Sequence, residues 1–470
     1  MHRNGIAENP EKKGEAAATR REGAGAGVVV RFAPSPTGLL HLGNVRAAVL
    51  NWLFARRHGG RFVLRFDDTD PGRVREEYVA AIREDLAWLG LDWDEEIRQS
   101  ARIDRYRRAA ERLKEAGRLY PCYETPEELD LKRRVQRMRG RPPVYDRAAL
   151  GLSEEERSRL EAEGRRPHWR FLLETDAPVE WDDLIRGRQR IDPASLSDPV
   201  LVREDGSFLY LLPSVVDDIE LGITHVIRGE DHVTNTAEQI QLVTALGGRP
   251  PAFAHFPLLL AADGRPLSKR AGDASLRRLR EEGVEPLAIV ALLATLGTGR
   301  AAESVTSLDA LVADFDLAAF SKAAVRLDSD QLHRLSRHAL HHLPWAAVAD
   351  RAELAGVGPE LWEVVRGNLD SLVDLGHWKR VVAGGIAPVI ADADRGFLAE
   401  AAELLPEDWS GDVWSRWTAE VRARTGRKGR ALFLPLRRAI TGRERGPEMS
   451  RLLPLIPRAL VERRLKGEEA

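Results

Sequence analysis

Two polar stretches, far apart in the chain, contain residue types that bind phosphate. The first is Arg31–Asn44 (RFAPSPTGLLHLGN), in which two prolines and two glycines fix a rigid turn directly after an apolar run. His41 and Asn44 then stand at the start of a predicted helix. Backbone amides and the helix dipole at such a start favour phosphate, and an imidazole adds a donor. Because a histidine here is by itself more often a helix cap, the motif needs a partner.

The second stretch is Asp263–Arg270 (DGRPLSKR), a Gly- and Pro-bearing loop. It ends in Lys269 and Arg270, whose charges could close over a triphosphate. Alone, it would pass for a basic surface loop. Two other nucleotide-binding patterns do not apply. The glycines of Glu22–Val28 (EGAGAGV) precede the first strand instead of following it, and the chain has no GxxxxGK[ST] sequence.

The elements that position the first stretch can be predicted from apolar spacing. Val28–Phe32 and Arg61–Phe66 are predicted strands, and Asn44–Arg57 between them is a predicted helix. Further amphipathic helices are predicted at Glu76–Leu89 and Arg102–Ala116. A strand, a loop, a helix and a second strand open a parallel, doubly wound sheet, which binds ligands at the carboxyl ends of its strands.

The chain is too long for one hydrophobic core, so several domains are expected. Residues 1–27 are polar and rich in Gly and Ala, which predicts a disordered extension. After 28–117, the proline-punctuated, charged segment 118–190 predicts an insertion domain. Strand patterns at 199–203, 208–211 and 224–227, with a helical pattern at 236–246, predict that the sheet resumes within 191–260. Helical patterns follow in 261–330 and 331–470. The predicted fold is therefore α/β, with a doubly wound parallel-sheet (Rossmann-type) domain, an insertion domain and an all-α C-terminal region.

Composition excludes several classes of protein. Apolar residues are 43% of 470, enough for buried cores, yet no run of about 18 apolar residues could span a bilayer. The N-terminus lacks the apolar segment of a secretory signal. The single cysteine, Cys122, cannot form an internal disulfide, which fits a reducing compartment and a cytoplasmic location.

Charge is unevenly distributed. Residues 414–470 contain fifteen Lys and Arg against six Asp and Glu, a net of +9, so a chain with a total of −2 carries −11 elsewhere. Such asymmetry favours a polyanionic partner at the C-terminal end. Solvated arginine-rich helices would give the same pattern, so charge alone leaves both interpretations open.

Taken together, the two stretches are specific. HLGN at 41–44 resembles the HIGH signature of class I aminoacyl-tRNA synthetases, and LSKR at 267–270 resembles their KMSKS signature. Three flanking segments narrow the resemblance to the bacterial glutamyl-tRNA synthetases: Arg65–Asp70 (RFDDTD), Ser214–Asp231 (SVVDDIELGITHVIRGED) and Pro435–Glu448 (PLRRAITGRERGPE). The resemblance runs from about residue 28 to 465.

The resemblance implies an ATP-dependent ligase. The carboxylate of L-glutamate would attack the α-phosphate of ATP, and the glutamyl-adenylate would then react with the 3′ end of tRNA(Glu), with tRNA(Gln) left open as a second substrate. Mg²⁺ would ride on the phosphates. Residues 118–190 would bind the acceptor end, 261–330 would carry the KMSKS loop and contact the stem, and 331–470 would bind the anticodon. A monomer without membrane contacts is expected.

The resemblance also implies roles for individual residues. His41 and Lys269 would be catalytic, stabilising charge on the phosphates. Arg31 would neutralise the side-chain carboxylate of glutamate, which distinguishes it from glutamine. The implied ATP-binding residues are His41, Gly43, Asn44, Asp231, Ser268, Lys269 and Arg270, with Gly43 leaving room for the base. The implied glutamate-binding residues are Arg31, Ala33, Ser35, Asp67 (ammonium), Tyr210, Ser214, Arg228 (α-carboxylate) and His232.

Several positions depart from the family pattern. Ser214 replaces an amide-bearing residue, His232 a common Trp, and Asp67 and Asp231 each a frequent Glu. Some relatives bind zinc through a CxC pair. Here the sequence is Cys122-Tyr-Glu124, so no zinc is predicted. His338, His341 and His342 are predicted to lie on a surface helix rather than to bind a metal.

Four alternatives stay open. A glutaminyl-tRNA synthetase usually reads PPEPNG where this chain has APSPTG at 33–38, and its anticodon part is β-rich. A tRNA-glutamylating paralogue would lack the long helical C-terminal region. A non-catalytic tRNA-binding relic would be expected to have lost His41 or Lys269. A non-discriminating synthetase would charge both tRNA(Glu) and tRNA(Gln).

Overall fold

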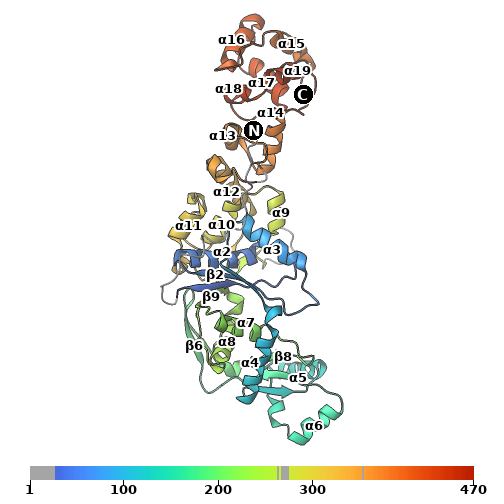
Figure 1. Ribbon diagram of the computed structural model, residues 1–470, viewed down its shortest axis with the longest axis vertical. Helices are drawn as coiled ribbons and strands as arrows, with labels where there is room; N and C mark the ends of the chain where they lie inside the picture. The colour runs from blue at the N-terminus through green and yellow to red at the C-terminus, as the bar shows by residue number, and fades with distance from the viewer. Residues whose placement is uncertain (1–26, 262–263, 266–274, 352–353) are drawn as a thin grey trace, which may run out of the picture.

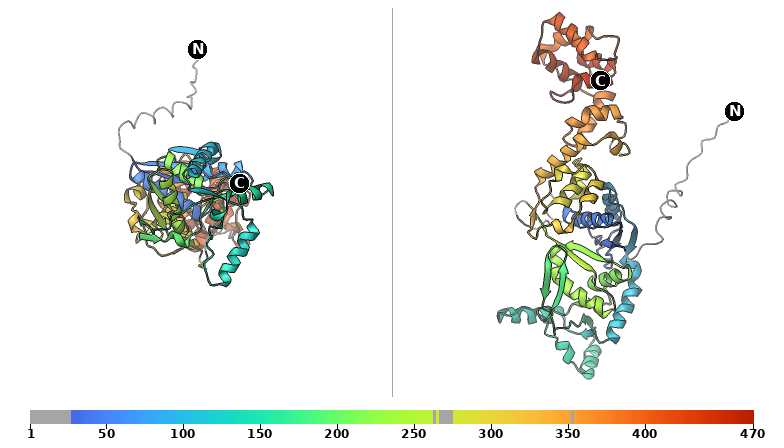
Figure 2. Two further views of the ribbon diagram at one scale, coloured as in Figure 1. Left: turned by 90° about the horizontal axis from the view of Figure 1, so that it is seen from below. Right: turned by 90° about the vertical axis from the view of Figure 1, so that its left-hand side faces the viewer.

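The computed structural model describes residues 27–261, 264–265, 275–351 and 354–470. The molecule is elongated, with the parallel strands near the middle, helices α5 and α6 at one end and the C-terminal helices at the other (Figures 1 and 2). Among the described residues no helix is long and apolar enough to cross a membrane. The predicted disordered extension, except for Gly27, lies outside these ranges.

A parallel sheet forms the centre, as predicted. Strands β1 (Val29–Phe32), β2 (Arg61–Phe66) and β3 (Glu95–Arg98) are parallel in the order β1-β2-β3. Strands β9 (His225–Gly229) and β10 (Ala252–Phe256) form a second parallel pair. The two sets adjoin where the amide of Thr224 donates to the carbonyl of Val29 (2.9 Å). The chain therefore leaves β1 toward β2 on one side and returns at β9 on the other, a topological switch point.

Helices cover both faces of these strands (Figure 1). Helices α2 (Leu42–Arg57), α3 (Glu76–Trp88) and α10 (Pro286–Thr295) lie on one side, and α4 (Ile103–Glu115), α7 (Leu211–Glu220) and α8 (Val233–Ala245) on the other. All four residues of β1 are consequently buried. Val30 and Phe32 pack into the core under α2, while Arg31 points to the opposite side because side chains alternate along a strand.

The insertion is built from short elements. They are β4 (Leu119–Cys122), α5 (Pro126–Met138), α6 (Glu154–Ala162), β5 (His168–Phe171) and the hairpin β6 (Val179–Asp183) and β7 (Gly187–Ile191). Helices α5 and α6 bury no residue and each begins with a capping box, so local hydrogen bonds rather than a core define their starts.

Two strand predictions need correction. The segment predicted at 199–203 forms β8 (Val200–Val202), but β8 pairs antiparallel with β5 and does not rejoin the parallel sheet. The strand predicted at 208–211 is wrong. Phe208 makes one isolated bridge to Val202, and α7 begins at Leu211. Short apolar runs do not distinguish a parallel strand from an antiparallel one or from the first turn of a buried helix.

The rest of the chain is almost entirely helical, as predicted. Strands β11 (Leu259–Leu260) and β12 (Val325–Arg326) form a two-residue parallel pair. The helices are α9 (Leu276–Glu281), α11 (Leu308–Asp314), α12 (Ser329–His342), α13 (Pro359–Val365), α14 (Leu375–Ala383), α15 (Arg395–Glu403), α16 (Val413–Thr425), α17 (Arg430–Thr441), α18 (Met449–Leu452) and α19 (Arg458–Leu465). Helices α13 to α19 share a core of their own, which fully buries Trp362, Trp378 and Trp417.

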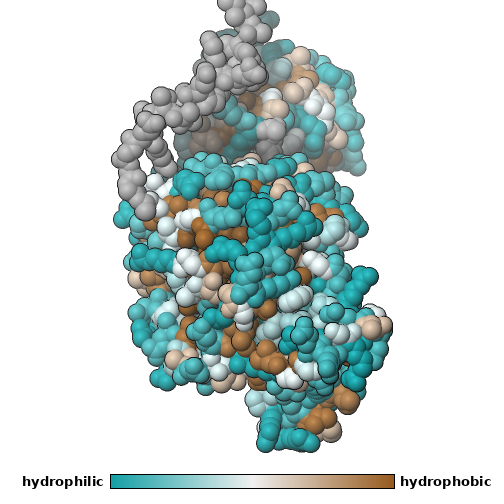
Figure 3. Space-filling view, turned by 60° about the horizontal axis from the view of Figure 1, so that its bottom comes forward, coloured by the Kyte–Doolittle hydropathy of each residue, from teal (hydrophilic) through white to brown (hydrophobic). Residues whose placement is uncertain are grey.

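The surface is mostly hydrophilic. In Figure 3 polar residues cover most of the visible face, and apolar patches lie between them. Two of the most exposed large apolar side chains, Leu131 and Met138, are on α5, which has no core of its own.

Candidate active site

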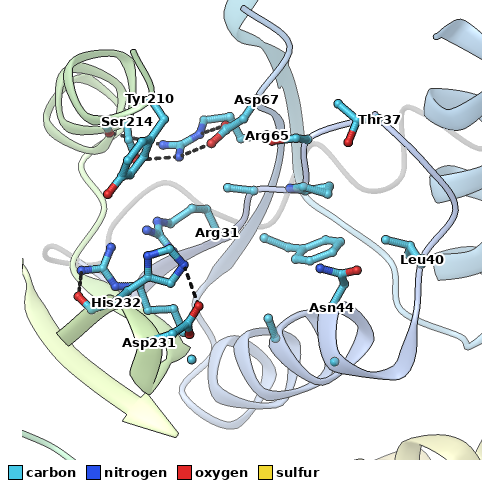
Figure 4. Close-up of a pocket in the computed structure, with 18 of the residues that line it drawn as sticks. Arg31, Thr37, Leu40, Asn44, Arg65, Asp67, Tyr210, Ser214, Asp231 and His232 are labelled. Atoms are coloured by element: carbon cyan, nitrogen blue, oxygen red, sulfur yellow. Dashed lines mark hydrogen bonds and ion pairs between the residues drawn. The ribbon is translucent and has the colours of Figure 1, made fainter. Parts of the chain in front are cut away.

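A cavity of about 850 Å³ opens at the carboxyl ends of β1, β2 and β9. This is the switch point of the sheet, where the diverging loops leave space for a ligand. Its walls come from the loop 33–40, the start of α2, the loop after β2, the start of α7 and the segment after β9. Figure 4 shows side chains from these elements pointing into one space.

His41 forms the N-terminal cap of α2. Its Nδ1 accepts hydrogen bonds from the amides of Gly43 (3.1 Å) and Asn44 (3.4 Å). A ring nitrogen that accepts carries no proton, so the neutral imidazole carries its proton on Nε2. The sequence leaves a helix cap and a phosphate donor as alternatives for His41, but the two roles would use different nitrogens of the same ring.

Gly43 is required by His41. A Cβ atom at residue 43 would lie 2.9 Å from His41 Cε1 and 3.0 Å from Nδ1. The imidazole can fold back over the helix start only because residue 43 has no side chain. The role implied by the resemblance, which is to leave room for the nucleotide base, stays a prediction.

Two buried arginines share one carboxylate beneath the cavity. Arg31 Nε donates to Asp218 Oδ1 (3.2 Å), and Arg65 Nη1 donates to the same oxygen (2.8 Å). Arg65 Nε also donates to Asp67 Oδ1 (2.7 Å), and Arg65 Nη2 donates to the hydroxyl of Ser214 (2.9 Å). The Arg31 and Arg65 side chains are only 7% and 1% exposed. Arg65 thus fixes Asp67 and Ser214, while Arg31 has only a share of a counter-ion.

Arg228 of β9 is a buried cation held by neutral groups. Its Nε bonds to His255 Nε2 (3.2 Å), and its Nη2 donates to the hydroxyl of Thr236 (2.7 Å) and the carbonyl of His232 (3.3 Å). Burial and, to a smaller extent, the neighbouring Arg31 together lower its pKa to about 10. Across the described residues no carboxylate forms an ion pair with Arg228. A buried guanidinium without a counter-ion favours an anionic ligand.

The outer rim is more exposed. Tyr210, at the start of α7, is 45% exposed, and its hydroxyl contacts Asn235 of α8. His232 Nε2 lies 3.6 Å from Asp231 Oδ2. Burial and the neighbouring Arg228 lower the pKa of His232, so its ring is neutral at pH 7.

The cavity therefore combines a helix N-terminus suited to phosphate with a buried group in which three arginines face two carboxylates, Asp67 and Asp218. Residues 27–334 match the family described as tRNA synthetases class I (E and Q), catalytic domain. The chain belongs to this family. Residues 389–467 match a second family, described as an anticodon binding domain.

Similar proteins cover almost the whole of this class I synthetase. A glutamate–tRNA ligase from Methylobacterium is 57% identical over 447 residues, which are 94% of this chain and 99% of that protein. A glutamate–tRNA ligase from Rhodospirillum rubrum is 56% identical over 444 residues with the same coverage. The crystal structure of a glutamate tRNA ligase from Elizabethkingia meningosepticum in complex with its amino acid has 29% identity and a TM-score of 0.78, covering 93% of this chain and 98% of that one.

The site residues predicted for this synthetase divide into two groups. The structure brings the described ones together at the cavity: Arg31, Ala33, Ser35, His41, Gly43, Asn44, Asp67, Tyr210, Ser214, Arg228, Asp231 and His232. Ser268, Lys269 and Arg270 lie outside the described residues. Both described flanks of that segment reach the cavity, because Leu259 lines it and Ser275 forms a β-bridge with His41.

Sequence reasoning missed the residues that hold the predicted ones in place. Arg65 and Asp218 lie within the motifs at 65–70 and 214–231, but the resemblance implies no role for either. Two polar doublets were signals: Asp67-Asp68 after a buried strand, and Asp217-Asp218 within an otherwise apolar helix. Ser214 is one of the positions that depart from the family pattern. Where the family has an amide-bearing side chain, the Ser214 hydroxyl accepts a hydrogen bond from Arg65 Nη2.

The insertion of the synthetase holds a cluster of metal-ligand types. Cys122 lies opposite His168 in the β4–β5 pair, and ligand atoms of Cys122, Glu124 and His168 all lie within 4.8 Å of one another. Glu124 Oε1 already accepts from Lys132 Nζ (3.2 Å) and the hydroxyl of Tyr145 (2.8 Å). Burial raises the pKa of the thiol to about 11. Glu124 Oε2 and His168 Nε2, however, form no hydrogen bond with any described residue. The cluster therefore offers two unpartnered ligand atoms beside a single thiol, and the absence of zinc stays a prediction.

The C-terminal histidines are bonded to backbone carbonyls. His342 Nδ1 contacts the carbonyl of His338 (2.8 Å) within α12, and His341 Nε2 contacts the carbonyl of Leu369 (3.0 Å). These contacts explain the three-residue cluster as part of a helix surface.

Proposed function

We propose that this synthetase ligates L-glutamate to the 3′ end of tRNA(Glu), through a glutamyl-adenylate and at the expense of ATP. The observation that carries the proposal is the cavity itself. It combines a helix N-terminus with His41 and two buried arginines that lack a full counter-ion. Glutamate has two carboxylates and ATP has a triphosphate, so the three anionic groups correspond to three cationic regions.

Arg31 and Arg228 are proposed to bind the two carboxylates of glutamate. They lie on adjacent strands, and the charge of each bears on the other. Asp67 would accept the substrate ammonium, since Arg65 holds its carboxylate at the cavity wall. Tyr210, Ser214 and His232 would complete the walls of the amino-acid pocket, with Ala33 and Ser35 at its entrance.

The start of α2 is proposed to bind the triphosphate. The backbone amides there and the His41 Nε2–H would donate to phosphate oxygens. Lys269, with Ser268 and Arg270, would approach from the other side. The support for this is that Ser275 pairs with His41 and that Leu276 donates its amide to the carbonyl of Leu40 (3.3 Å).

The reaction needs no nucleophile from the protein. A carboxylate oxygen of glutamate forms a bond to the α-phosphorus of ATP, and the bond to the bridging oxygen breaks, releasing pyrophosphate. A ribose hydroxyl at the tRNA 3′ end then attacks the glutamyl carbonyl, AMP leaves, and the hydroxyl proton passes to AMP or water. His41 and Lys269 would stabilise the charge that develops on the phosphates.

Mg²⁺ is proposed to arrive with ATP. Among the described residues the one group of three metal-ligand side chains is that in the insertion, so the cavity does not provide a protein cage. The ion would offset charge on the departing pyrophosphate.

The proposed tRNA contacts lie at both ends of the molecule. The insertion would bind the acceptor end, residues 261–330 would contact the stem, and the helices of 331–470 would bind the anticodon. The match of residues 389–467 to an anticodon binding domain supports the last assignment. A monomer would suffice, because one chain supplies every proposed contact.

An ATP–pyrophosphate exchange assay with glutamate in the presence of total tRNA tests the activity. Exchange is expected with glutamate and not with glutamine, and Lys269→Ala should reduce it roughly 100-fold while tRNA binding persists. Absence of exchange with any tRNA would refute the proposal.

Glutaminyl-tRNA synthetase is the alternative within the same family. The side-chain amide of glutamine is neutral, so glutamine would supply only one carboxylate for the two buried arginines, Arg31 and Arg228. Glutamate supplies two, and the buried arginines therefore favour glutamate. Aminoacylation of purified tRNA(Glu) and tRNA(Gln), side by side, would establish which tRNA is charged and whether both are.

A further inference from the structure

Behind Arg228 lies a buried relay of polar side chains that the reaction does not use directly. Asp183, the last residue of β6, and His255 of β10 form a hydrogen bond of 2.5 Å between Oδ2 and Nδ1. Both side chains are fully buried. His255 Nε2 in turn contacts Arg228 Nε at 3.2 Å. Three residues from separate strands thus form one continuous chain that ends at the cavity.

The protonation states in this chain follow from its neighbours. Burial lowers the pKa of His255. Burial alone would raise the pKa of Asp183, but the hydrogen bonds from His255 and from the Arg186 amide outweigh it and lower that pKa. His255 is therefore neutral with its proton on Nδ1, given to Asp183. Its Nε2 is an acceptor, which is the only state that can receive the Arg228 Nε–H.

This arrangement orients Arg228 without neutralising it. A carboxylate in direct contact would satisfy the guanidinium and weaken its attraction for a ligand. A neutral imidazole fixes the direction of Nε, and the Thr236 hydroxyl and His232 carbonyl fix Nη2. No hydrogen bond of Nη1 joins it to any part of the chain that the structure describes, so this nitrogen is left for an anion.

We propose that Asp183 and His255 are positioning residues for the amino-acid substrate. Asp183 fixes the tautomer of His255, and His255 in turn fixes the orientation in which the Arg228 guanidinium binds the α-carboxylate of that substrate. The inference rests on the proposed function, because it assigns Arg228 to glutamate. It also extends the amino-acid site into the β6–β7 hairpin, whose Leu184 amide donates to the Phe253 carbonyl (2.9 Å).

Asp183→Asn separates this role from a purely structural one. Asp183 Oδ1 accepts from the amides of Ile185 (3.0 Å), Arg186 (2.9 Å) and His255 (3.1 Å), and an asparagine oxygen can keep all three bonds. The asparagine NH₂ would instead donate to His255 Nδ1, which moves the imidazole proton to Nε2 and turns it against Arg228. The inverted tautomer is expected to raise the KM for glutamate roughly 10- to 100-fold, with little change in the KM for ATP or in Tm.

The matched control is Asp182→Asn, one residue earlier on the same hairpin. Asp182 is 77% exposed and pairs with Arg188 at the surface, so its variant should behave as the parent. If Asp183→Asn does not fold, His255→Asn serves instead: its amide can still donate to Asp183 but cannot reach Arg228. The ¹⁵N spectrum of histidine-labelled protein should show a hydrogen-bonded Nδ1–H for His255 in the parent.

The outcomes are distinguishable. A parent without glutamate-dependent exchange would refute the proposed function, whereas an Nε2–H tautomer of His255 in the parent would refute the relay. With an active parent, an Asp183→Asn variant with unchanged KM for glutamate would also overturn the inference. So would equal rises in both KM values together with a fall in Tm, which would indicate a structural role alone.

Discussion

His41 shows why the type of a single residue matters at the start of α2. Its Nδ1 accepts from two backbone amides, and this bond places the proton on Nε2, the nitrogen proposed to donate to a phosphate. Many side chains can cap a helix, and several can donate to phosphate, but a neutral imidazole does both at once. Gly43 makes this cap possible, because the absence of a Cβ atom lets the His41 ring fold back over the start of the helix.

Two variants of His41 should separate the cap from the donor. In His41→Asn the side-chain oxygen can still accept from the amides of residues 43 and 44, so Tm should stay near that of the parent. With that oxygen in the place of Nδ1, the asparagine NH₂ takes the place of the imidazole Cδ2 and ends one bond short of Nε2. The donor is therefore displaced from the phosphate, and the rate of glutamate-dependent exchange should fall roughly 100- to 1,000-fold. His41→Ala should lose the same activity and, in addition, about 1 kcal/mol of stability.

Exchange kinetics and thermal melts of the two His41 variants are the measurements. If His41→Asn retained activity, the imidazole would be a cap only. If both variants melted at the parental temperature, the two amide bonds would contribute nothing to α2.

At the scale of elements, the sequence predicts the positions of strands, which local patterns determine. It misses contacts between residues on strands that are far apart in the chain. The run 28–32 and the run 61–66 predict β1 and β2 to within a residue, because both are mostly apolar and each follows a glycine. The loops after these two strands, which carry the motif residues, both line the cavity. Nothing local indicates that Cys122 would face His168, or that Asp183 would reach His255. The first contact depends on which strands pair and the second on which strands pack side by side, across 46 and 72 residues of chain.

The β4–β5 pair allows a test of the predicted absence of zinc. Three ligand atoms converge there, but the Lys132 ammonium already lies on Glu124 and the Arg170 guanidinium lies 4.2 Å from the centre of the Tyr145 ring. These resident cations offset the charge that would attract a divalent ion. Elemental analysis of the purified protein is expected to find well under one zinc per chain. Stoichiometric zinc that disappears in Cys122→Ser would contradict this.

The same strand pair should make the insertion sensitive to acid. Burial and, to a smaller extent, the neighbouring Arg170 together lower the pKa of His168 to about 4. In the unfolded chain the pKa is about 6.5, so between the two pKa values the unfolded state binds a proton and the folded state does not. Stability from this residue is complete above about pH 6.5 and is lost as the pH falls toward 4, by about 2 kcal/mol at pH 5.

Thermal melts at pH 7 and pH 5, in parent and His168→Gln, would measure this loss. The variant should lose less stability than the parent on acidification, because glutamine does not titrate. His333→Gln is the control, since His333 is 52% exposed and should leave the parental pH dependence intact. An equal loss in parent and His168→Gln would show that other groups cause the acid sensitivity.

At the scale of the whole molecule, the proposed contacts with tRNA are distributed along its length. The insertion lies at one end, the cavity lies near the middle, and α13 to α19 form the other end (Figure 1). A tRNA presents its acceptor end and its anticodon far apart, so an elongated partner can bind both at once. The excess of +9 in residues 414–470 then acts at the end away from the reaction.

The ion pairs of this C-terminal end distinguish contact residues from solvated ones. Many of its arginines pair with acids, as Arg438 does with Glu444 and Arg458 does with Glu462. Four exposed cations at the end of α16 and the start of α17 form no ion pair with any described residue: Arg422, Arg424, Lys428 and Arg430. A phosphate backbone could bind these four without displacing a carboxylate, so they are expected to carry the electrostatic contact with tRNA.

Replacing the four unpaired cations by Gln should weaken tRNA binding by roughly 10-fold or more near physiological salt. The slope of log affinity against log salt should fall by about 3, because each lost phosphate contact removes about 0.7 to 0.9. The control replaces four paired arginines, Arg416, Arg438, Arg458 and Arg463, which changes net charge equally. Filter binding over a salt series measures both sets. Equal slopes in the two would mean that the overall field of this end, and not contact at the α16–α17 turn, attracts the tRNA.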